Sequence, residues 1–544
     1  MKRKLLSFAL AGAFTISSIG QVQVKAAETS RENGDSKNVI MLVMDGTSNN
    51  AITLARWYKG ERLAMDEILT GAVTTYSAES AITDSAPAAT ALATGHKSNS
   101  GYVGVLPTIV DMPGVKENPK NEFIPVANVL EGAKQLGKAT GIISTSEIQH
   151  ATPAGFSAHV TSRKNYDDIG EQQIYQNIDV ILGGGYQFLQ PENRADGEDL
   201  IKVLEEKGYD YITTRDELLT TDAEKIYGSF SPTALAYEFD RKLTNPEEPT
   251  LAEMTAKAID ILSQDEDGFF LFVEGSKIDW AAHANDPIGM ISDVLSFDEA
   301  VGVAIDYAKK DGNTMVIAVS DHGNSGITIG NENTTKTYDT IHISNYINPL
   351  KEAKMTVEGA LKELKEDRSN LVAVAGLYGL TNLTKEELSI LEETETENLG
   401  SAFVKLLSSR ADIGFTTGGH TGDDVFLYSY GPKLITGLVD NTDLAKEMAN
   451  FMGFDLDELT KELYIPAEEA LKAKRFTVSI DDTNVNNPVL VAKKGGITYR
   501  LPENKDYIIK EDAGGTTTII QTNTIHVFND SAFFISEETI NQIK

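Results

Sequence analysis

Continuous runs of apolar residues, each ending at a polar residue or a glycine cluster, constrain the fold more than any other feature of this chain. The first run, VIMLVM at residues 39–44, stops at Asp45. Similar runs occupy residues 139–144, 179–182, 269–273 and 314–319. A strand without polar alternation is buried on both faces, which is typical of a parallel sheet covered by helices.

Segments with helical patterns lie between these runs, at residues 87–93, 126–136, 251–262 and 288–308. This alternation predicts an α/β fold with a doubly wound, mainly parallel sheet flanked by helices. Asp45, Glu274, Asp321 and His322 each come just past the end of a predicted strand. Because ligands of open α/β sheets bind at these strand ends, we expect the four residues to belong to one site.

The remaining segments predict further parts of the chain. Residues from about 331 to 411 contain helical stretches and are expected to form an insertion. From about residue 476, short β-like runs are split by Asn, Asp and Gly, which predicts a small C-terminal β-rich region. The expected division is a leader at 1–26, a catalytic domain at 27–463 and the β-rich region at 464–544.

The N-terminus has the pattern of a secretory signal peptide. Three basic residues at positions 2–4 precede an apolar stretch to about Gly20, and VKA at 24–26 precedes Ala27. A membrane anchor is the alternative, but the stretch is short and interrupted by serines and a glycine. No later segment has the ~18 apolar residues of a spanning helix. We therefore expect a secreted protein without a membrane span.

The composition limits the partners and the chemistry. The net charge is −33, and loss of residues 1–26 would remove four basic residues and no acid. Bulk charge therefore disfavours binding to nucleic acid, and an anionic substrate needs local positive charge from arginines or metals. The chain has no cysteine, which excludes disulfides and thiolate ligands.

Three histidines stand in a pattern of metal ligands with aspartates. Asp279 and His283 are spaced i, i+4, Asp321 and His322 follow a buried run, and His420 stands among glycines. Carboxylate oxygen and imidazole nitrogen are the ligands that zinc binds when no thiolate is present. Taken singly, these residues could also be a solvated helix pair, an aspartate-stabilised turn and a loop histidine.

Two further segments carry chemistry. Ser85 precedes an Ala-rich helical segment, where its hydroxyl would lie at an anion-binding helix end, although Asp84 or Ser85 could simply cap that helix. No Gly-x-Ser-x-Gly motif surrounds Ser85, so activation by a metal is favoured. Thr152 offers a hydroxyl suited to Mg²⁺, and Arg163 offers a fork that matches phosphate, although alone it would be interpreted as a surface arginine.

Together these motifs resemble the alkaline phosphatase family of bacteria and animals. The matching stretches are VMDG, TDSA, ATP, AHVTSR, VEGSKID with His283, SDHG and GHT. They occur in the family's order between residue 43 and about residue 422. Each stretch is short, but their joint occurrence is specific.

The resemblance implies a secreted hydrolase of small phosphate monoesters, with Ser85 as the nucleophile that forms a phosphoserine and Arg163 binding phosphate. It also implies two Zn²⁺ and one Mg²⁺, and family members are commonly homodimers. The implied ligands are Asp279, His283 and His420 for one zinc, Asp45, Asp321 and His322 for the other, and Asp45, Thr152 and Glu274 for magnesium.

Three neighbours are expected around these ligands, namely Asp84, His150 and Trp280. His150 stands where the best-known bacterial branch has an aspartate, which predicts a magnesium site that is weaker or partly open to zinc. Trp280 stands where that branch has a lysine that reaches phosphate, which predicts faster phosphate release. His159 is interpreted as structural, and the other histidines, His96, His342 and His526, show no ligand context.

Two other functional classes fit parts of the sequence. A related metallohydrolase of phosphodiesters or sulfate esters would share the fold and the Asp/His set. However, many diesterases use threonine and lack a match to Arg163, and the sulfatase motif is absent. A surface-binding protein that acts through its C-terminal β-rich region is the other class. Turnover of a monoester against a diester, and truncation near Leu463, would discriminate these hypotheses.

Overall fold

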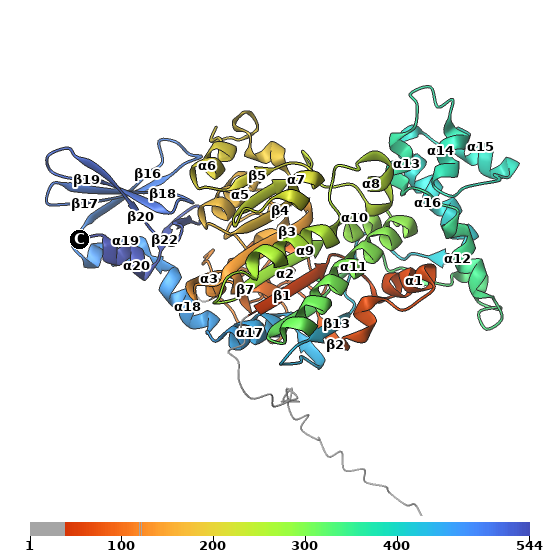
Figure 1. Ribbon diagram of the computed structural model, residues 1–544, viewed down its shortest axis with the longest axis horizontal. Helices are drawn as coiled ribbons and strands as arrows, with labels where there is room; N and C mark the ends of the chain where they lie inside the picture. Colours follow the sequence, from red (N-terminus) through yellow and green to blue (C-terminus); the bar gives the residue numbers. More distant parts are fainter. Residues whose placement is uncertain (1–37, 119, 121) are drawn as a thin grey trace, which may run out of the picture.

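A ten-stranded sheet forms the centre of the computed structural model, which describes residues 38–118, 120 and 122–544 (Figure 1). The predicted leader lies outside the described residues. From edge to edge the strands are β14 (Gly437–Asp440), β2 (Leu69–Thr74), β13 (Val425–Tyr430), β8 (Thr314–Val319), β1 (Asn38–Met44), β7 (Phe269–Gly275), β3 (Ala139–Glu147), β4 (Val180–Gly184), β6 (Ile226–Ser229) and β5 (Asp210–Ile212). β13 runs antiparallel to both of its neighbours, and the other pairings are parallel. The predicted fold class is confirmed.

The central strand β1 is buried along its whole length. Val39, Met41 and Val43 belong to one hydrophobic core, whereas the alternate residues Ile40 and Leu42 belong to a second core. Successive side chains of a strand point to opposite faces, so each face of the sheet needs its own helical cover. This arrangement explains why the sequence of β1 shows no polar alternation.

Helices cover both faces of the sheet. The second core is closed mainly by α1 (Asn49–Lys59), α9 (Leu251–Leu262) and α11 (Pro287–Asp311), and the first by α2 (Ser85–Thr94), α3 (Val129–Gln135), α17 (Asn441–Met452) and α18 (Leu456–Leu463). The other helices of this region are α4 (Ala151–Gly155), α5 (Tyr166–Tyr175), α6 (Leu200–Glu206), α7 (Arg215–Thr220), α8 (Glu238–Thr244) and α10 (Lys277–His283).

The predicted insertion forms a cluster of helices at one end of the molecule (Figure 1). Its helices are α12 (Ile343–Lys351), α13 (Val357–Lys362), α14 (Leu371–Leu377), α15 (Lys385–Glu393) and α16 (Leu399–Arg410). Two short ladders close its base, β9 (Gly323–Asn324) with β12 (His420–Thr421) and β10 (Thr328–Ile329) with β11 (Ile413–Gly414). These ladders return the chain to the sheet beside the point where it left.

The C-terminal region lies at the opposite end (Figure 1). A five-stranded antiparallel sheet contains β16 (Thr477–Asp481), β17 (Val489–Lys494), β18 (Ile497–Pro502), β19 (Tyr507–Glu511) and β20 (Thr517–Gln521). A smaller sheet contains β15 (Ile465–Pro466), β22 (Phe533–Ile535) and β21 (Val527–Phe528), and helices α19 (Ala467–Ala473) and α20 (Glu537–Gln542) cover the core. The predicted β-like runs did not include β15 or β18, and neither helix was predicted.

Buried ion pairs fasten this C-terminal region to the catalytic part. The Nζ atom of Lys505 lies 3.0 Å from Glu171 and 2.5 Å from Glu198. Glu171, Asp196 and Glu198 lie close enough together to hold a cation, but Lys505 and Arg194 already supply positive charge to them. This acidic group is therefore explained by ion pairs that join the C-terminal region to residues beside the ten-stranded sheet.

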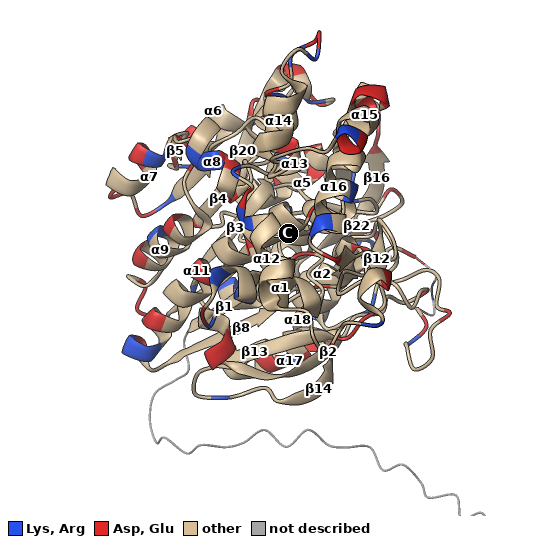
Figure 2. Ribbon diagram, turned by 90° about the vertical axis from the view of Figure 1, so that its right-hand side faces the viewer, with Lys and Arg blue, Asp and Glu red and all other residues tan. Residues whose placement is uncertain are grey.

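Among residues 38–544 as described, no helix combines the length and apolar character needed to cross a membrane. Acidic residues are spread over many surface helices, including α9 and α15, with basic residues between them (Figure 2). The excess of acid therefore does not gather into one patch in this view.

Candidate metal centre and nucleophile

The register of the central strands brings three acidic side chains together at the C-terminal ends of these strands. Val43 of β1 lies opposite Glu274 of β7 on one side and Val319 of β8 on the other. Asp45 follows one residue after β1, and Asp321 follows two residues after β8. Glu274 was predicted to follow its strand but lies within β7. All three acids are nearly inaccessible to solvent.

The first group of metal-ligand type contains Asp279, His283 and His420. The Nε2 atoms of the two histidines lie 3.2 Å apart, and the Asp279 carboxylate lies 3.4 Å from His283 and 3.7 Å from His420. The Nδ1 atom of His283 contacts the carbonyl oxygen of Gly418, and that of His420 contacts the carbonyl oxygen of Thr83. Such contacts fix the rings with Nε2 toward the shared space.

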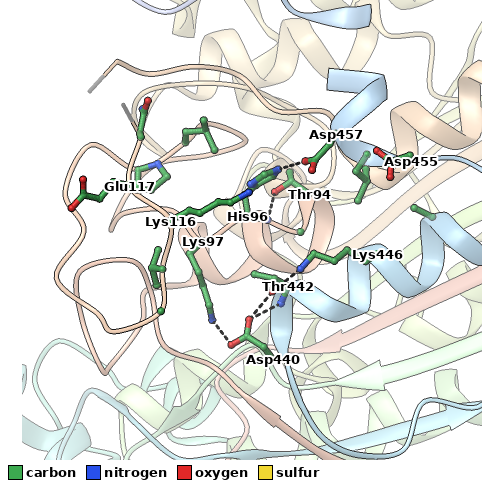
Figure 3. Close-up of a pocket in the computed structure, with 18 of the residues that line it drawn as sticks. Thr94, His96, Lys97, Lys116, Glu117, Asp440, Thr442, Lys446, Asp455 and Asp457 are labelled. Carbon is green, nitrogen blue, oxygen red and sulfur yellow. Dashed lines mark hydrogen bonds and ion pairs between the residues drawn. The ribbon is translucent and has the colours of Figure 1, made fainter. Parts of the chain in front are cut away.

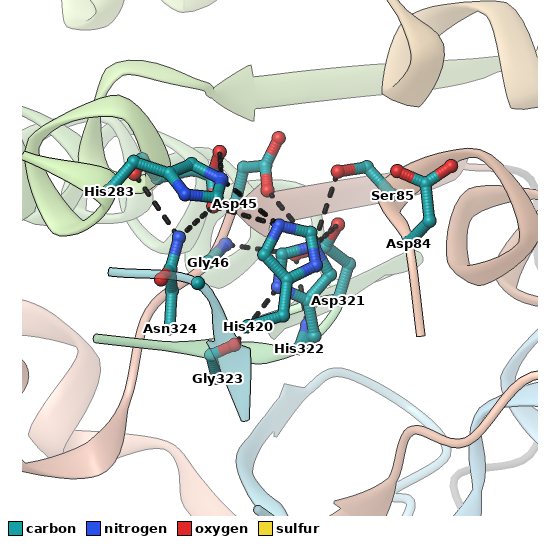
Figure 4. A network of polar contacts seen from close by, with 12 residues as sticks. Asp45, Gly46, Asp84, Ser85, His283, Asp321, His322, Gly323, Asn324 and His420 are labelled. Atoms are coloured by element: carbon teal, nitrogen blue, oxygen red, sulfur yellow. Dashed lines mark hydrogen bonds and ion pairs between the residues drawn. The ribbon is translucent and has the colours of Figure 1, made fainter. Parts of the chain in front are cut away.

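The second group contains Asp45, Asp321 and His322, and Ser85 lies against it (Figure 4). The Ser85 Oγ atom is 3.2 Å from His322 Nε2, which also lies 3.3 Å from Asp321 Oδ2 and 3.6 Å from Asp45 Oδ1. Burial and the charge of His420 lower the pKa of His322 to about 3. His322 is therefore neutral, which is the form that binds metals.

The third group contains Asp45, His150 and Glu274. The Thr152 Oγ1 atom donates to Asp45 Oδ2 over 3.3 Å, which places the predicted threonine beside the same group. Ser144 donates to Glu274 Oε2 over 2.6 Å. Asp45 belongs to the second and third groups, so the two groups share one carboxylate.

The oxygen and nitrogen atoms that the second and third groups could offer to a metal are suited to binding cations. Three of them, Asp45 Oδ1, Glu274 Oε1 and Asp321 Oδ2, are buried without a hydrogen-bond partner. Such atoms are rare unless an ion or ligand satisfies them. Burial and neighbouring carboxylates raise the pKa of Asp45, and burial raises the pKa values of Glu274 and Asp321 to about 7. A cation would relieve this repulsion, so the residues fit metal binding.

Ser85 is the first residue of α2, and Asp84 is its N-cap residue. The Asp84 side chain makes no capping hydrogen bond. It accepts instead from Arg163 Nη1 and from the backbone N–H of Gly101. Burial opposes ionisation of Asp84, but the charge of Arg163 and the Gly101 hydrogen bond lower its pKa overall. Asp84 therefore anchors Arg163 beside Ser85, and the simple capping interpretation is wrong for its side chain.

His150 and Trp280, the two positions that differ from the best-known bacterial branch, lie against each other. Arg163 Nη2 donates to His150 Nε2 over 3.1 Å, and the His150 ring meets the Trp280 ring edge-on, with centroids 5.9 Å apart. Burial and the charge of Arg163 lower the pKa of His150 to about 3. Weaker magnesium binding and faster phosphate release, which the sequence predicted for these positions, remain predictions.

The other histidines lie outside the three groups. His159 is buried in a network with Glu131 and Tyr464, as expected for a structural residue. His96 contacts Asp457 in a cavity of about 760 Å³ at the C-terminal end of α2, opposite the Ser85 end (Figure 3). His342 contacts Ser344 at the surface, and His526 contacts the carbonyl oxygen of Pro502.

Sequence reasoning missed the residues that orient the candidate ligands. Asn324 Nδ2 donates to Asp279 Oδ1 over 2.7 Å, and Ser144 forms a buried hydroxyl network with Ser146 and Ser276 behind Glu274. The sequence gives little sign of these roles, although Asn324 follows the SDHG stretch directly and Ser276 lies inside VEGSKID.

A doubly wound sheet with grouped metal ligands at its strand ends, and a serine at a neighbouring helix start, defines a metal-binding hydrolase. The family model described as alkaline phosphatase matches residues 36–454, and the chain belongs to the alkaline phosphatase family. It is thus a phosphoric monoester hydrolase, and enzymes of this family typically depend on metal ions.

Individual relatives agree with this assignment. Alkaline phosphatase 4 of Bacillus subtilis (strain 168) is 37% identical over 472 residues, which cover 82% of this chain and 96% of that protein. The crystal structure of a cold-active alkaline phosphatase from a psychrophilic Shewanella sp. has a TM-score of 0.66 and 29% identity, and covers 76% of this chain and 99% of its own. Thermus thermophilus alkaline phosphatase has a TM-score of 0.69 and 26% identity, with 80% and 94% covered.

Proposed function

We propose that this alkaline phosphatase hydrolyses phosphate monoesters through a phosphoserine on Ser85, at a site for two Zn²⁺ and one Mg²⁺. The observation that carries the proposal is the position of Ser85 Oγ, 3.2 Å from His322 Nε2 and beside the carboxylates of Asp45 and Asp321. A serine hydroxyl that faces a group of cation ligands is placed for activation as a nucleophile.

The three groups divide the ions among them. Asp279, His283 and His420 would hold one zinc, Asp45, Asp321 and His322 the second zinc, and Asp45, Thr152 and Glu274 the magnesium, with His150 adjacent. When bound, the ions supply positive charge that stabilises the serine alkoxide and the oxygens of the transferring phosphoryl group.

The chain's own residues carry the transfer. Ser85 Oγ attacks phosphorus after its proton has passed to solvent, and the bond to the alcohol oxygen breaks as the Ser85 Oγ–P bond forms, so that the alcohol leaves and takes up a proton. The guanidinium of Arg163, held by Asp84 and His150, donates to the phosphoryl oxygens, and the N-terminus of α2 adds backbone N–H groups. Water then attacks phosphorus, releasing phosphate and restoring the Ser85 hydroxyl.

The decisive assay is hydrolysis of p-nitrophenyl phosphate at alkaline pH before and after chelation, with zinc and magnesium added back. We expect chelation to abolish activity, and Ser85→Ala to lower kcat by at least about 10³-fold, as for other nucleophile removals. Activity that survives complete metal removal would contradict the mechanism. Faster turnover of bis(p-nitrophenyl) phosphate would instead favour a diesterase.

We also propose that the protein is secreted after cleavage following Ala26. The basic residues at positions 2–4, the apolar stretch and VKA at 24–26 support this. N-terminal sequencing of protein recovered from the culture medium should begin at Ala27. Protein found only inside cells, with Met1 retained, would exclude secretion.

A further inference from the structure

The ammonium group of Lys277 is buried, and none of the roles described above uses it. Lys277 is the first residue of α10, the helix that carries Asp279 and His283. Its side chain is 3% exposed. The Nζ atom lies 4.3 Å from the centroid of the Trp280 ring and 4.1 Å from that of the Tyr237 ring. A lysine so placed is held between two aromatic faces.

The Trp280 ring connects Lys277 to the phosphate-binding arginine. Trp280 meets His150 edge-on, at an interplanar angle of 73°. His150 Nε2 in turn accepts the hydrogen bond from Arg163 Nη2. Three successive contacts therefore lead from the Lys277 ammonium to the Arg163 guanidinium, which Asp84 holds from its other side.

The helical insertion supplies the counter-charge of Lys277. Glu358 of α13 places Oε2 3.9 Å from Lys277 Nζ, and its other oxygen lies 2.6 Å from Lys362 Nζ. The two lysines differ in environment, because the Lys362 side chain is 68% exposed whereas that of Lys277 is buried. A cation–π contact is stronger when the cation is desolvated. The buried Lys277 therefore holds the Trp280 ring more firmly than an exposed lysine would.

We propose that Lys277 is a positioning residue of the phosphate site. It fixes the Trp280 ring and, through His150, the orientation of Arg163, while Glu358 links this chain of contacts to the insertion. This inference rests on the proposed role of Arg163 in binding phosphate. Loss of the ammonium would free the Trp280 ring, so phosphate and substrate should bind less tightly while the step at Ser85 is less affected.

Trp280 itself offers a readout that does not depend on turnover. The chain has two tryptophans, and the other, Trp57, is 40% exposed, so Trp57→Phe leaves Trp280 as the single tryptophan. In this background, Lys277→Met should shift the emission maximum and increase acrylamide quenching. It should also raise KM and the phosphate inhibition constant together, by about threefold to tenfold, with kcat changed less than about twofold.

Three variants complete the experiment. Lys277→Arg keeps a cation over the rings and should restore most of the phosphate affinity. Glu358→Gln should move the quenching and the inhibition constant in the same direction as Lys277→Met, but less. Lys362→Met removes only the exposed partner of Glu358 and should match the Trp57→Phe parent in every measurement.

The outcomes separate this inference from the proposed function. If the parent hydrolyses p-nitrophenyl phosphate, and Lys277→Met has unchanged quenching and phosphate inhibition, the positioning role is wrong. If the parent does not hydrolyse the ester, the proposed function fails, and unchanged quenching would still refute the fixing of Trp280. If Lys277→Met does not fold, Glu358→Gln decides, because unchanged quenching and inhibition in that variant would overturn the link to the insertion.

Discussion

The Nε2 atoms of His283 and His420 face each other at 3.2 Å beside the Asp279 carboxylate. Each ring has its Nδ1 against a backbone carbonyl oxygen, at 2.9 Å and 2.8 Å, and a carbonyl oxygen only accepts. In their neutral forms both rings therefore keep the proton on Nδ1, and the two Nε2 lone pairs point into the same space. This arrangement is stable when a cation lies between the rings.

Replacing one of these histidines should remove a metal ion as well as activity. His420→Ala is expected to bind about one zinc fewer per chain and to lose at least about 100-fold in kcat/KM, more than changes beyond the ligand shell usually cost. Metal analysis after dialysis and p-nitrophenyl phosphate turnover would measure both. His342→Ala is the matched control, because the hydrogen bonds described for His342 join it to Ser344 at the surface. Full zinc content in His420→Ala would show that the group is not a zinc site.

The third group should respond to a change at position 150. His150 Nδ1 is buried without a partner, and an aspartate would place carboxylate oxygens, the ligands that Mg²⁺ prefers, in the same space. We expect His150→Asp to retain more magnesium and less zinc after dialysis than the wild type does. His342→Asp controls for the added charge. Equal magnesium retention in wild type and His150→Asp would contradict the hypothesis that His150 weakens magnesium binding at this site.

The central strands were predictable because burial on both faces leaves an uninterrupted apolar run, as in β1. The outer strands were not. β2 reads LTGAVT and β6 reads IYGS, and such short segments with glycine or threonine resemble loops. Helix α19, AEEALKA, carries a clear local helix signal that its β-like surroundings obscured. Local patterns predict elements well only where tertiary burial imposes one periodicity along the whole segment.

The sequence predicted the candidate metal-binding residues one by one, but their grouping required the family resemblance. His420 stacks on His322 only because β9 and β12 pair across the base of the insertion. The orienting contacts made by Asn324, Gly418 and Thr83 depend on the same long-range register. Composition and spacing contain no signal for contacts of this kind.

The C-terminal region should contribute strongly to stability through Lys505. This side chain is 6% exposed and pairs with Glu171 and Glu198 across the boundary to the catalytic part. Lys505→Met leaves these carboxylates short of a counter-charge in a buried position, which should lower the unfolding free energy by roughly 2–4 kcal/mol. Urea denaturation followed by circular dichroism, at fixed metal concentration, would measure the loss. Lys472→Met, which breaks an exposed pair with Glu468, should change stability little. Equal losses in the two variants would contradict a special contribution of the buried Lys505 pairs to stability.

Asp293 should make the folded state less stable as pH rises. Burial raises the pKa of Asp293 to about 8, against the charge of Lys277 and a hydrogen bond from Ser292. An acid with a raised pKa keeps its proton in the folded state when the unfolded chain has lost it. The protonated Asp293 therefore makes its full contribution to wild-type stability below about pH 4, which is the pKa of an aspartate in the unfolded chain. This contribution declines as the pH rises and is lost above about pH 8, the folded-state pKa.

Asp293→Asn removes this titration, because the amide cannot ionise. The unfolding free energy of the variant minus that of the wild type should therefore be larger at pH 9 than at pH 5, by on the order of 1 kcal/mol or more. The variant thus becomes more stable relative to the wild type as pH rises. Thermal unfolding at both pH values, in the same metal-containing buffer, would show the difference. Asp367→Asn, at a fully exposed position, should give the same offset at both values. A relative stability of Asp293→Asn that does not change between pH 5 and pH 9 would mean that Asp293 is ionised in the folded protein throughout this range.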